Sequence, residues 1–227
     1  MNAIVIIAPN RENFLEYCLP SVEHFAGKYN VNVEVVREEA YDLKATSHYN
    51  YKIFEKFQVN KFTDKYDRVL RLDADIIFSP YCPDLFKKFG EEKIWGVFED
   101  NGNRRSDRRR QMILIQQQLG DLGWNNGYIN AGVILTSKAH VKLYDIDKEY
   151  LDLVIPKGLG KFKEQSLINW RIRRFGYELG NMGYKFNHMS KNTDSKHRPE
   201  NSYIVHFAGR QAGKIDKMRK LYKFWYV

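Results

Sequence analysis

Cysteine is scarce in this chain of 227 residues, which has only Cys18 and Cys82 and no paired cysteine motif. This excludes a disulfide scaffold and a cysteine-type zinc site, and it predicts a reducing compartment. Long apolar runs are also lacking. The run at residues 3–8 is too short for a signal sequence and has no basic flank, and no segment approaches the ~20 apolar residues of a membrane span. We therefore expect a soluble protein of the cytoplasm.

Glycine is missing from the turn after the first predicted strand, Ala8-Pro9-Asn10-Arg11. A sugar nucleotidyltransferase would carry a glycine-rich phosphate loop at this point, so its absence argues against that class. Acidic residues are in deficit: 37 Lys and Arg against 28 Asp and Glu give a net charge of +9. This balance indicates an anionic partner, namely nucleic acid, a membrane surface or a small acidic substrate such as a nucleotide.

Predicted strands and helices alternate from the first residues onward. With 43% hydrophobic and 29% charged residues, the composition is that of a globular protein. Predicted strands cover residues 3–8, 31–36, 69–72, 94–98, 128–135 and 202–207, and the main predicted helices cover 14–25, 49–57, 85–89, 165–175 and 214–225. This order predicts a single α/β domain over residues 1–227, with a mostly parallel, Rossmann-like central sheet flanked by helices.

The strongest chemical motif is the predicted strand 68–72, which runs directly into Asp73-Ala74-Asp75. Side chains two residues apart on a strand share a face, so both carboxylates can be presented together at a strand end, where open α/β sheets bind ligands. Two unpaired carboxylates repel each other unless a cation holds them, and their oxygens suit Mg²⁺ or Mn²⁺ bridging to a diphosphate. Such a triplet also arises by chance: residues 145–147 are another, in a predicted amphipathic helical stretch with no buried strand before it.

Other polar residues lie at the ends of predicted elements, and each has two interpretations. His206 ends the last predicted strand and either completes a metal site or is a structural histidine, while Gly209 lets backbone approach a phosphate. Asn130 binds a sugar hydroxyl or simply starts its strand. Glu164, just before Gln165, acts chemically or only favours a helix N-terminus.

Two basic segments are also open to two interpretations. The run Arg104–Arg110 is either a solvated charged face or a receiver of an anionic acceptor. In the closing helix, residues 214–225, lysines and an arginine alternate with Ile, Met, Leu and aromatic residues. This amphipathic pattern predicts either peripheral contact with a membrane surface or a packed C-terminal helix with solvated lysines.

Taken together and in this order, these motifs resemble family 8 glycosyltransferases, retaining enzymes of the GT-A fold related to glycogenin and bacterial galactosyltransferases. The similarity runs nearly end to end. Six segments carry it: the nucleotide-binding opening Ile4–Phe14, the metal motif Arg68–Asp75, the strand with a terminal acid Gly96–Asp100, the Asn-Ala-Gly strand Tyr128–Leu135, the helix start Glu164–Asn169 and the His-x-x-Gly turn His206–Gly209. The resemblance implies a metal-dependent enzyme that moves a sugar from a nucleotide-sugar donor to a glycan, lipid or protein acceptor. In that family the donor is most often a UDP-sugar.

The resemblance also implies roles for individual residues. Mn²⁺ (or Mg²⁺) would be held by Asp73, Asp75 and His206. Nucleotide-sugar binding would fall mainly within residues 1–100 and acceptor-side elements within 101–227. The implied donor-binding positions are Ala8 and Asn10 at the base, Lys52 near the donor, Asp73, Ala74, Asn130 and Ala131 around the sugar and metal, and Gly209 and Lys214 at the diphosphate. The implied catalytic residues are Glu164, Gln165 and Asp100.

Two departures from the family pattern affect these assignments. The acid before Gln165 is Glu164, one methylene longer than the family's Asp. The family's Lys-Pro-Trp after the glycine is missing, so Arg210 or Lys214 would have to supply the diphosphate contact. An inverting enzyme needs a carboxylate base beside the acceptor hydroxyl. Glu164 is the one candidate, and the resemblance places it near the donor sugar, so we predict retention.

Other classes of protein fit the sequence less well. A phosphatase or nuclease would also use two aspartates and Mg²⁺. Such an enzyme would need further acids or a lysine at later strand ends, and Asp100 alone is weak evidence for them. A non-enzymatic module that binds nucleic acid or a membrane would explain the charge but not the paired carboxylates. We therefore expect no nucleic acid partner.

Overall fold

The fold is built on a six-stranded sheet with the strand order β2-β1-β3-β6-β5-β7. It is seen in a computed structural model that describes residues 1–41, 51–157, 163–189, 196–209 and 212–227. The strands are β1 (Asn2–Ile7), β2 (Asn32–Val36), β3 (Arg68–Asp73), β5 (Ile94–Gly96), β6 (Val133–Ser137) and β7 (Leu179–Asn181). Only β6 runs against the others, pairing antiparallel with both β3 and β5. The prediction of a mostly parallel central sheet is confirmed.

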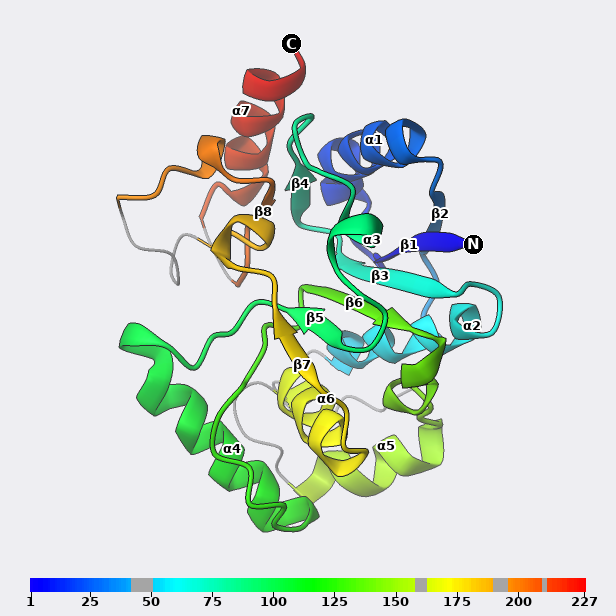
Figure 1. Cartoon of the computed structure of the whole chain (residues 1–227), viewed down its shortest axis with the longest axis vertical. Coiled ribbons are helices and arrows are strands. Elements are labelled where there is room, and N and C mark those ends of the chain that lie inside the picture. The colour runs from blue at the N-terminus through cyan, green and yellow to red at the C-terminus, as the bar shows by residue number, and fades with distance from the viewer. Residues whose placement is uncertain (42–50, 158–162, 190–195, 210–211) are drawn as a thin grey trace.

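Helices cover both faces of this sheet (Figure 1). α1 (Glu12–Tyr29) and α7 (Lys214–Tyr226) lie on one side, and α4 (Arg105–Leu119), α5 (Lys148–Val154) and α6 (Lys163–Arg174) on the other. The shorter helices are α2 (Asn60–Thr63) and α3 (Leu85–Lys88), together with the 3₁₀ segments η1 (Tyr51–Val59), η2 (Gly102–Arg104), η3 (Lys138–Leu143), η4 (Ile155–Lys157), η5 (Tyr184–Phe186) and η6 (Pro199–Asn201).

Two apolar cores result, one on each face of the sheet. Ile4 and Ile6 of β1 face the core that contains α1 and α7, whereas Ala3 and Val5 face the core that contains α4 to α6. Successive residues of a strand point to opposite faces, so a strand covered on both sides is apolar throughout. The continuous apolar run at the start of the chain follows from this burial.

A small second sheet brings a distant segment to the end of β3. It pairs β4 (Ile76–Phe78), which follows the acidic motif, antiparallel with β8 (Ile204–His206). Tyr226 of α7 donates a hydrogen bond of 2.8 Å to the carbonyl oxygen of Phe78, so the closing helix packs beside this sheet. Neither β4 nor β7 was predicted, because both are strands of three residues and β7 reads Leu-Gly-Asn.

Two other predictions about local structure are wrong. β6 begins at Val133 and not at Tyr128, because the residues before it form a turn around Asn130. The second acidic triplet does not lie within a helix. It connects η3 to α5, where the Oδ1 atom of Asp147 accepts a hydrogen bond of 2.7 Å from the backbone nitrogen of Tyr150 and caps α5.

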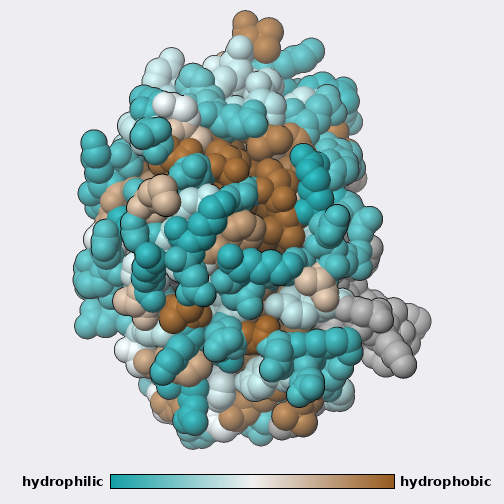
Figure 2. Space-filling view, turned by 90° about the vertical axis from the view of Figure 1, so that its right-hand side faces the viewer, coloured by the Kyte–Doolittle hydropathy of each residue, from teal (hydrophilic) through white to brown (hydrophobic). Residues whose placement is uncertain are grey.

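The face of the molecule on the side of β2 is mainly hydrophilic (Figure 2). β2 is an edge strand, and its residues Val33 and Val35 are only partly buried. Figure 2 shows the face on this side of the molecule, where hydrophilic residues surround a hydrophobic area. Within the described residues, no helix combines the length and the apolar character that crossing a membrane requires.

Candidate active site

The acidic motif lies where two parallel strands end side by side. Ile7, the last residue of β1, pairs with Asp73, the last residue of β3. The chain then bends at Ala74 and Asp75 before it enters β4, and Ile76 of β4 pairs with His206 of β8. This arrangement gathers the carboxyl ends of two buried strands and the end of β8 at one place.

Two carboxylates and one imidazole converge there. His206 Nε2 lies 3.2 Å from Asp75 Oδ1 and 3.7 Å from Asp73 Oδ2. One ligand atom from each of the three residues lies within 4.8 Å of the other two. The structure therefore brings together the three residues that the sequence predicts as metal ligands.

Three cationic side chains already balance these carboxylates. Lys56 Nζ lies 3.0 Å from Asp73 Oδ2, Arg71 Nη1 lies 3.0 Å from Asp73 Oδ1, and Lys214 Nζ lies 2.6 Å from Asp75 Oδ2. From the sequence alone, the two aspartates are expected to be unpaired groups that only a bound cation would hold together. That premise is wrong, because the chain supplies its own counter-charges.

Burial and these charges act in opposite directions on the acid pKa values. Burial raises the pKa of Asp73, but Lys56, Arg71 and His206 outweigh it and bring that pKa below its ordinary value. Burial also raises the pKa of Asp75, and His206 and Lys214 outweigh it in the same way. Both groups are therefore carboxylates at neutral pH, the state that binds a cation.

A buried amide network adjoins the cluster. Gln165 Oε1 accepts hydrogen bonds from the backbone nitrogen of Ala131 (3.2 Å) and from Asn130 Nδ2 (3.3 Å). Gln165 Nε2 donates to Glu99 Oε2 at 2.9 Å. These bonds fix the side chain of Gln165 against the turn that precedes β6.

Glu164 connects the same helix to the acidic motif. Lys56 Nζ lies 3.0 Å from Glu164 Oε1 as well as 3.0 Å from Asp73 Oδ2, so it bridges the two carboxylates. Burial lowers the pKa of Lys56, but Asp73 and Glu164 outweigh burial and leave it above its ordinary value. The bridge therefore joins a permanent cation to two acids that lie far apart in sequence.

Asn130 links the amide network to the imidazole. Its Oδ1 atom accepts from the backbone nitrogen of Gly132 (2.7 Å) and from Asn187 Nδ2 (2.8 Å). Asn187 Oδ1 lies 3.0 Å from His206 Nδ1, so a proton on Nδ1 is donated to that oxygen and leaves Nε2 available toward the carboxylates. A Cβ atom at Gly132 would lie 2.1 Å from His206 Cε1, so this position needs glycine for the ring to fit.

Glu99, rather than Asp100, faces this network. Asn130 Nδ2 donates to Glu99 Oε1 at 3.0 Å, and Arg108 of α4 donates to Glu99 Oε2 from Nε at 2.7 Å. Asp100 faces a different environment. Its Oδ2 atom accepts a hydrogen bond of 2.6 Å from the backbone nitrogen of Gly127, and it lines a cavity at the start of α4.

The remaining predicted positions surround the cluster or lie outside the described residues. Ala8 is buried at the end of β1, and Asn10 is exposed with a φ of 57°. Lys214 Nζ lies 5.2 Å from the centre of the Phe14 ring, so the start of α1 and the start of α7 meet beside the acids. Gly209 has a φ of 75°, a conformation that favours glycine. Arg210 and the side chain of Lys52 are not among the described parts.

Several residues of this site were not found from the sequence. Lys56 follows Lys52 by four residues in η1, so the correct segment was chosen but not the residue that reaches Asp73. Glu99 is adjacent to Asp100, and only the structure shows which of them points inward. Arg108 belongs to the basic run Arg104–Arg110, and nothing in the sequence distinguishes this buried arginine from the exposed arginines around it. Asn187 lies in a segment with no recognisable pattern, and only the fold places it beside His206.

Comparison with known proteins gives the same class. Residues 8–212 match the sequence profile of Glycosyl transferase family 8. The fold is similar to that of a glycosyltransferase involved in glycosylation of the major capsid of PBCV-1, at 14% identity and a TM-score of 0.62 over 96% of this chain and 99% of that chain. It is also similar to the galactosyltransferase LgtC in complex with donor and acceptor sugar analogs, at 17% identity and a TM-score of 0.62 over 100% and 97%. Mouse xyloside xylosyltransferase 1 aligns at 12% identity and a TM-score of 0.51 over 91% and 97%. No curated protein sequence matches the chain.

The fold and the site thus define a GT-A type glycosyltransferase. The chain belongs to glycosyltransferase family 8, which makes it a hexosyltransferase enzyme that takes a nucleotide-sugar donor and an acceptor. This assignment favours sugar transfer over the phosphatase, nuclease and non-enzymatic alternatives.

Proposed function

We propose that this enzyme transfers a sugar from a UDP-sugar to a hydroxyl group of a glycan, lipid-linked or protein acceptor, with retention of the anomeric configuration. The convergence of Asp73, Asp75 and His206 at the ends of β3 and β8 carries the proposal. Two carboxylates and an imidazole at the carboxyl ends of the strands of an α/β sheet would hold a divalent cation, which would neutralise charge on a diphosphate.

The donor set fits Mn²⁺ or Mg²⁺. Carboxylate oxygens suit both ions, while the imidazole nitrogen of His206 favours Mn²⁺, because Mg²⁺ binds almost entirely to oxygen. Asn187 holds the Nδ1 atom of the ring, and the ring lies so close to Gly132 that a Cβ atom there would clash with it. When bound, the cation supplies electrostatic stabilisation of the leaving diphosphate.

Residues of the chain itself bind the donor and stabilise the leaving group. Breaking the bond between the anomeric carbon and the phosphate oxygen leaves negative charge on the diphosphate. Lys214, which pairs with Asp75, is positioned to exchange this partner for a phosphate oxygen. Ala8 and Asn10, in the turn that follows β1, are proposed to contact the base. Lys56 fixes Glu164 and Asp73 relative to each other.

Glu164 and Gln165 are proposed to face the sugar as it gains positive charge. The oxygen of Gln165 is held by Asn130 and by Ala131, so it is oriented before the substrate arrives. The acceptor oxygen forms the new bond to the anomeric carbon on the face that the diphosphate leaves, and the acceptor proton passes to the departing phosphate oxygen. No carboxylate base is then required.

Binding of UDP with Mn²⁺, measured by calorimetry, tests the metal site. We expect Asp75→Ala to abolish Mn²⁺-dependent UDP binding while the protein stays folded, as followed by circular dichroism. Asp145→Ala is the matched control, because Asp145 is an exposed acid of the second triplet and should bind UDP as the wild type does. Unchanged UDP affinity of the Asp75 variant in Mn²⁺ would reject the site.

Product stereochemistry tests the mechanism separately. Proton NMR distinguishes the two outcomes by the anomeric coupling constant of the product. With retention, Glu164→Gln and Gln165→Ala should each lower kcat partially and to a comparable extent, because neither removes an essential base. An inverted product together with a completely inactive Glu164→Gln enzyme would reject retention and leave the fold assignment intact.

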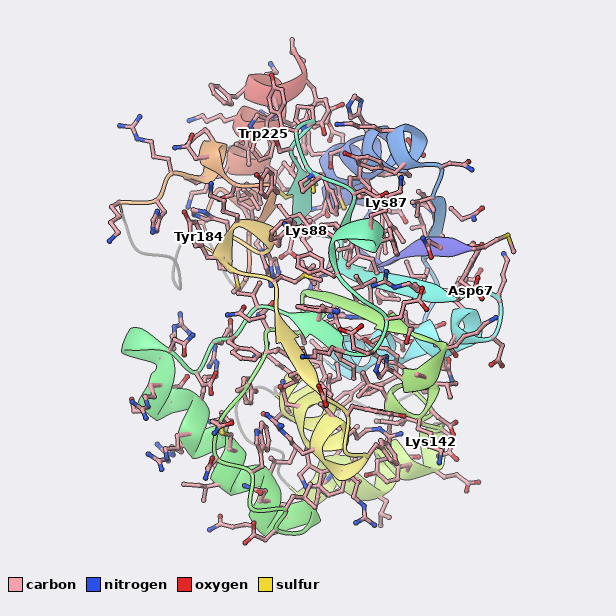
Figure 3. All side chains as sticks on the ribbon, in the orientation of Figure 1. Asp67, Lys87, Lys88, Lys142, Tyr184 and Trp225 are labelled. Carbon is pink, nitrogen blue, oxygen red and sulfur yellow. The ribbon has the colours of Figure 1, made fainter. Side chains whose placement is uncertain are left out.

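We further propose that α7 attaches the enzyme peripherally to the cytoplasmic face of an anionic membrane. Lys217, Lys220 and Lys223 are exposed on this helix, and Phe224 is 68% exposed beside them. Trp225, labelled in Figure 3, is instead partly buried and packs against the core, so the apolar stripe of the helix mainly serves folding. Attachment would therefore depend on charge, and high salt should release the protein from anionic vesicles. Equal sedimentation with neutral and anionic vesicles would reject it.

A further inference from the structure

Arg71 is a fully buried arginine beside the candidate cation site, with 0% of its surface exposed. It lies on β3, where its backbone pairs with Val5 of β1 and with Ile134 of β6. Paired residues of neighbouring strands point to the same face of a sheet, and Val5 and Ile134 both belong to the core that contains α4 to α6. The guanidinium group therefore lies within this core and is closed off from solvent.

The contact between Arg71 and Asp73 follows from their positions on the strand. Asp73 is two residues further along β3, so both side chains lie on one face. Arg71 Nη1 lies 3.0 Å from Asp73 Oδ1, and within the described residues Asp73 is the one acid with which Arg71 forms an ion pair. An arginine that gave up this acid would be a buried charge without a counter-charge, which is costly. The guanidinium group therefore stays with Oδ1.

The two lysines of the site are held less firmly. Lys56 Nζ pairs with Asp73 Oδ2 and Lys214 Nζ pairs with Asp75 Oδ2, and these lysine side chains are 14% and 13% exposed, against 0% for Arg71. A long ammonium side chain that reaches the surface can turn to solvent or to a phosphate oxygen when a cation enters. The two oxygens of Asp73 are thus unequal, because Oδ2 can be released to a cation and Oδ1 cannot.

This inequality affects the choice of cation. Ca²⁺ takes about six to eight oxygen ligands and often uses both oxygens of a carboxylate, whereas Mg²⁺ needs octahedral geometry and few carboxylates. Mn²⁺ likewise occupies octahedral sites. A guanidinium nitrogen 3.0 Å from Oδ1 opposes the approach of a second positive charge to that oxygen. The site therefore lacks a ligand oxygen that Ca²⁺ would use and that the smaller ions do not need.

We propose that Arg71 is a positioning residue that restricts Asp73 to one ligand oxygen and thereby selects Mn²⁺ or Mg²⁺ over Ca²⁺. The assignment rests on the proposed function and adds a determinant of ion choice to its cation site. A purely structural role would have a different consequence, since loss of the arginine would then change the affinity for each of these cations by a similar factor.

Cation-dependent binding of UDP tests this assignment. Equilibrium dialysis with radiolabelled UDP gives the concentration of Mn²⁺ or of Ca²⁺ at which UDP binding by the full-length protein is half-maximal. The ratio of the Ca²⁺ value to the Mn²⁺ value measures selectivity, and complexes of UDP with either cation in solution affect every variant equally. We expect the wild type to need less Mn²⁺ than Ca²⁺. Arg71→Met should lower the ratio about tenfold, because one further charged contact to Ca²⁺ contributes roughly this factor.

Arg68→Met is the matched control. Arg68 is a second buried arginine of β3, but it donates to the carbonyl oxygens of Phe89 and Gly90 and to no acid of the site. This variant should keep the wild-type ratio. Circular dichroism checks that each variant is folded. If Arg71→Met is not, Arg71→Gln also removes the charge beside Oδ1 and should show the same fall in the ratio.

Three results would overturn the role of Arg71 and leave the proposed cation site in place. These are a ratio in the Arg71 variant equal to or above that of the wild type, an equal fall in Arg68→Met, and a wild type that binds UDP as readily with Ca²⁺ as with Mn²⁺. A wild-type protein whose UDP binding responds to neither cation would instead reject the cation site and the role of Arg71 together.

Discussion

Replacing Gly132 by alanine places a methyl group against the imidazole of the cation site. The added Cβ atom would lie 2.1 Å from His206 Cε1, 2.4 Å from His206 Nδ1 and 2.8 Å from Asn130 Oδ1. Contacts this short cannot persist, and the ring is the part that must yield, because β8 and the turn before β6 are both buried. Overpacking of a buried site costs roughly 1–3 kcal/mol. Moving the ring also breaks its bond to Asn187, and loss of such support lowers metal affinity roughly 10–100-fold.

We therefore expect Gly132→Ala to lower the free energy of unfolding modestly and to raise the Kd for Mn²⁺ by that factor. Urea denaturation and calorimetric titration with Mn²⁺ measure the two effects. Gly27→Ala is the matched control: no atom lies within 4 Å of its added Cβ, and it is in α1. The control should gain roughly 0.5–1 kcal/mol, because glycine is unfavourable within a helix. A Gly132→Ala protein that binds Mn²⁺ as tightly as the wild type would refute the placement of His206.

Three other predictions follow from buried charges and histidines. Arg108→Gln leaves Glu99 as a buried charge without this cation and should lower the free energy of unfolding in urea by about 3–5 kcal/mol; a loss below 1 kcal/mol would contradict the burial of this pair. Lys56→Met should lower kcat in a donor-hydrolysis assay with little loss of Mn²⁺ binding, since Asp73 keeps its contact to Arg71, and an unchanged kcat would count against the bridge to Glu164. Burial is the main cause that lowers the pKa values of His140 and His188 below 6.5, the value expected in the unfolded chain. The unfolded chain then binds more protons, so stability should be fully present above pH 6.5 and fall as the pH is lowered through the folded pKa values; His140→Asn should reduce that fall in urea denaturation at pH 7.5 and 5.5.

Periodicity in the sequence was sufficient for the elements with large apolar faces. β1 and α1 were found because burial on both sides makes the strand uniformly apolar, and because the inner face of the helix repeats at helical spacing. β7 was not found, since Leu179-Gly180-Asn181 is stabilised by its neighbours rather than by its own composition. Trp95 is one of them: a Cβ atom at Gly180 would lie 2.2 Å from its ring, so the glycine reflects a tertiary contact that no local pattern records.

The site residues were predictable where they are close together in the sequence. They were not predictable where the direction of a side chain decides which residue enters the site. Asp73 and Asp75 are two residues apart at the end of a strand, so their proximity follows from the sequence. Whether Glu99 or Asp100 points inward depends on how the chain leaves β5, and the sequence gives no information about that. The counter-charge of Lys214 to Asp75 depends on how α7 packs, which is a property of the complete fold.

Because β8 pairs with β4, the imidazole joins the carboxylates only after nearly the entire site has been synthesised. Chains emerge from the ribosome at roughly 5–20 residues per second, so on the order of ten seconds separate the appearance of Asp73 from that of His206. Lys56 and Arg71 precede Asp73 in the chain, and the first carboxylate therefore meets its counter-charges at once. A nascent chain arrested before β8 would hold both acids and no complete cation site. If the proposed function holds, affinity for the cation is acquired late in synthesis, when the chain that must fold around it is already present.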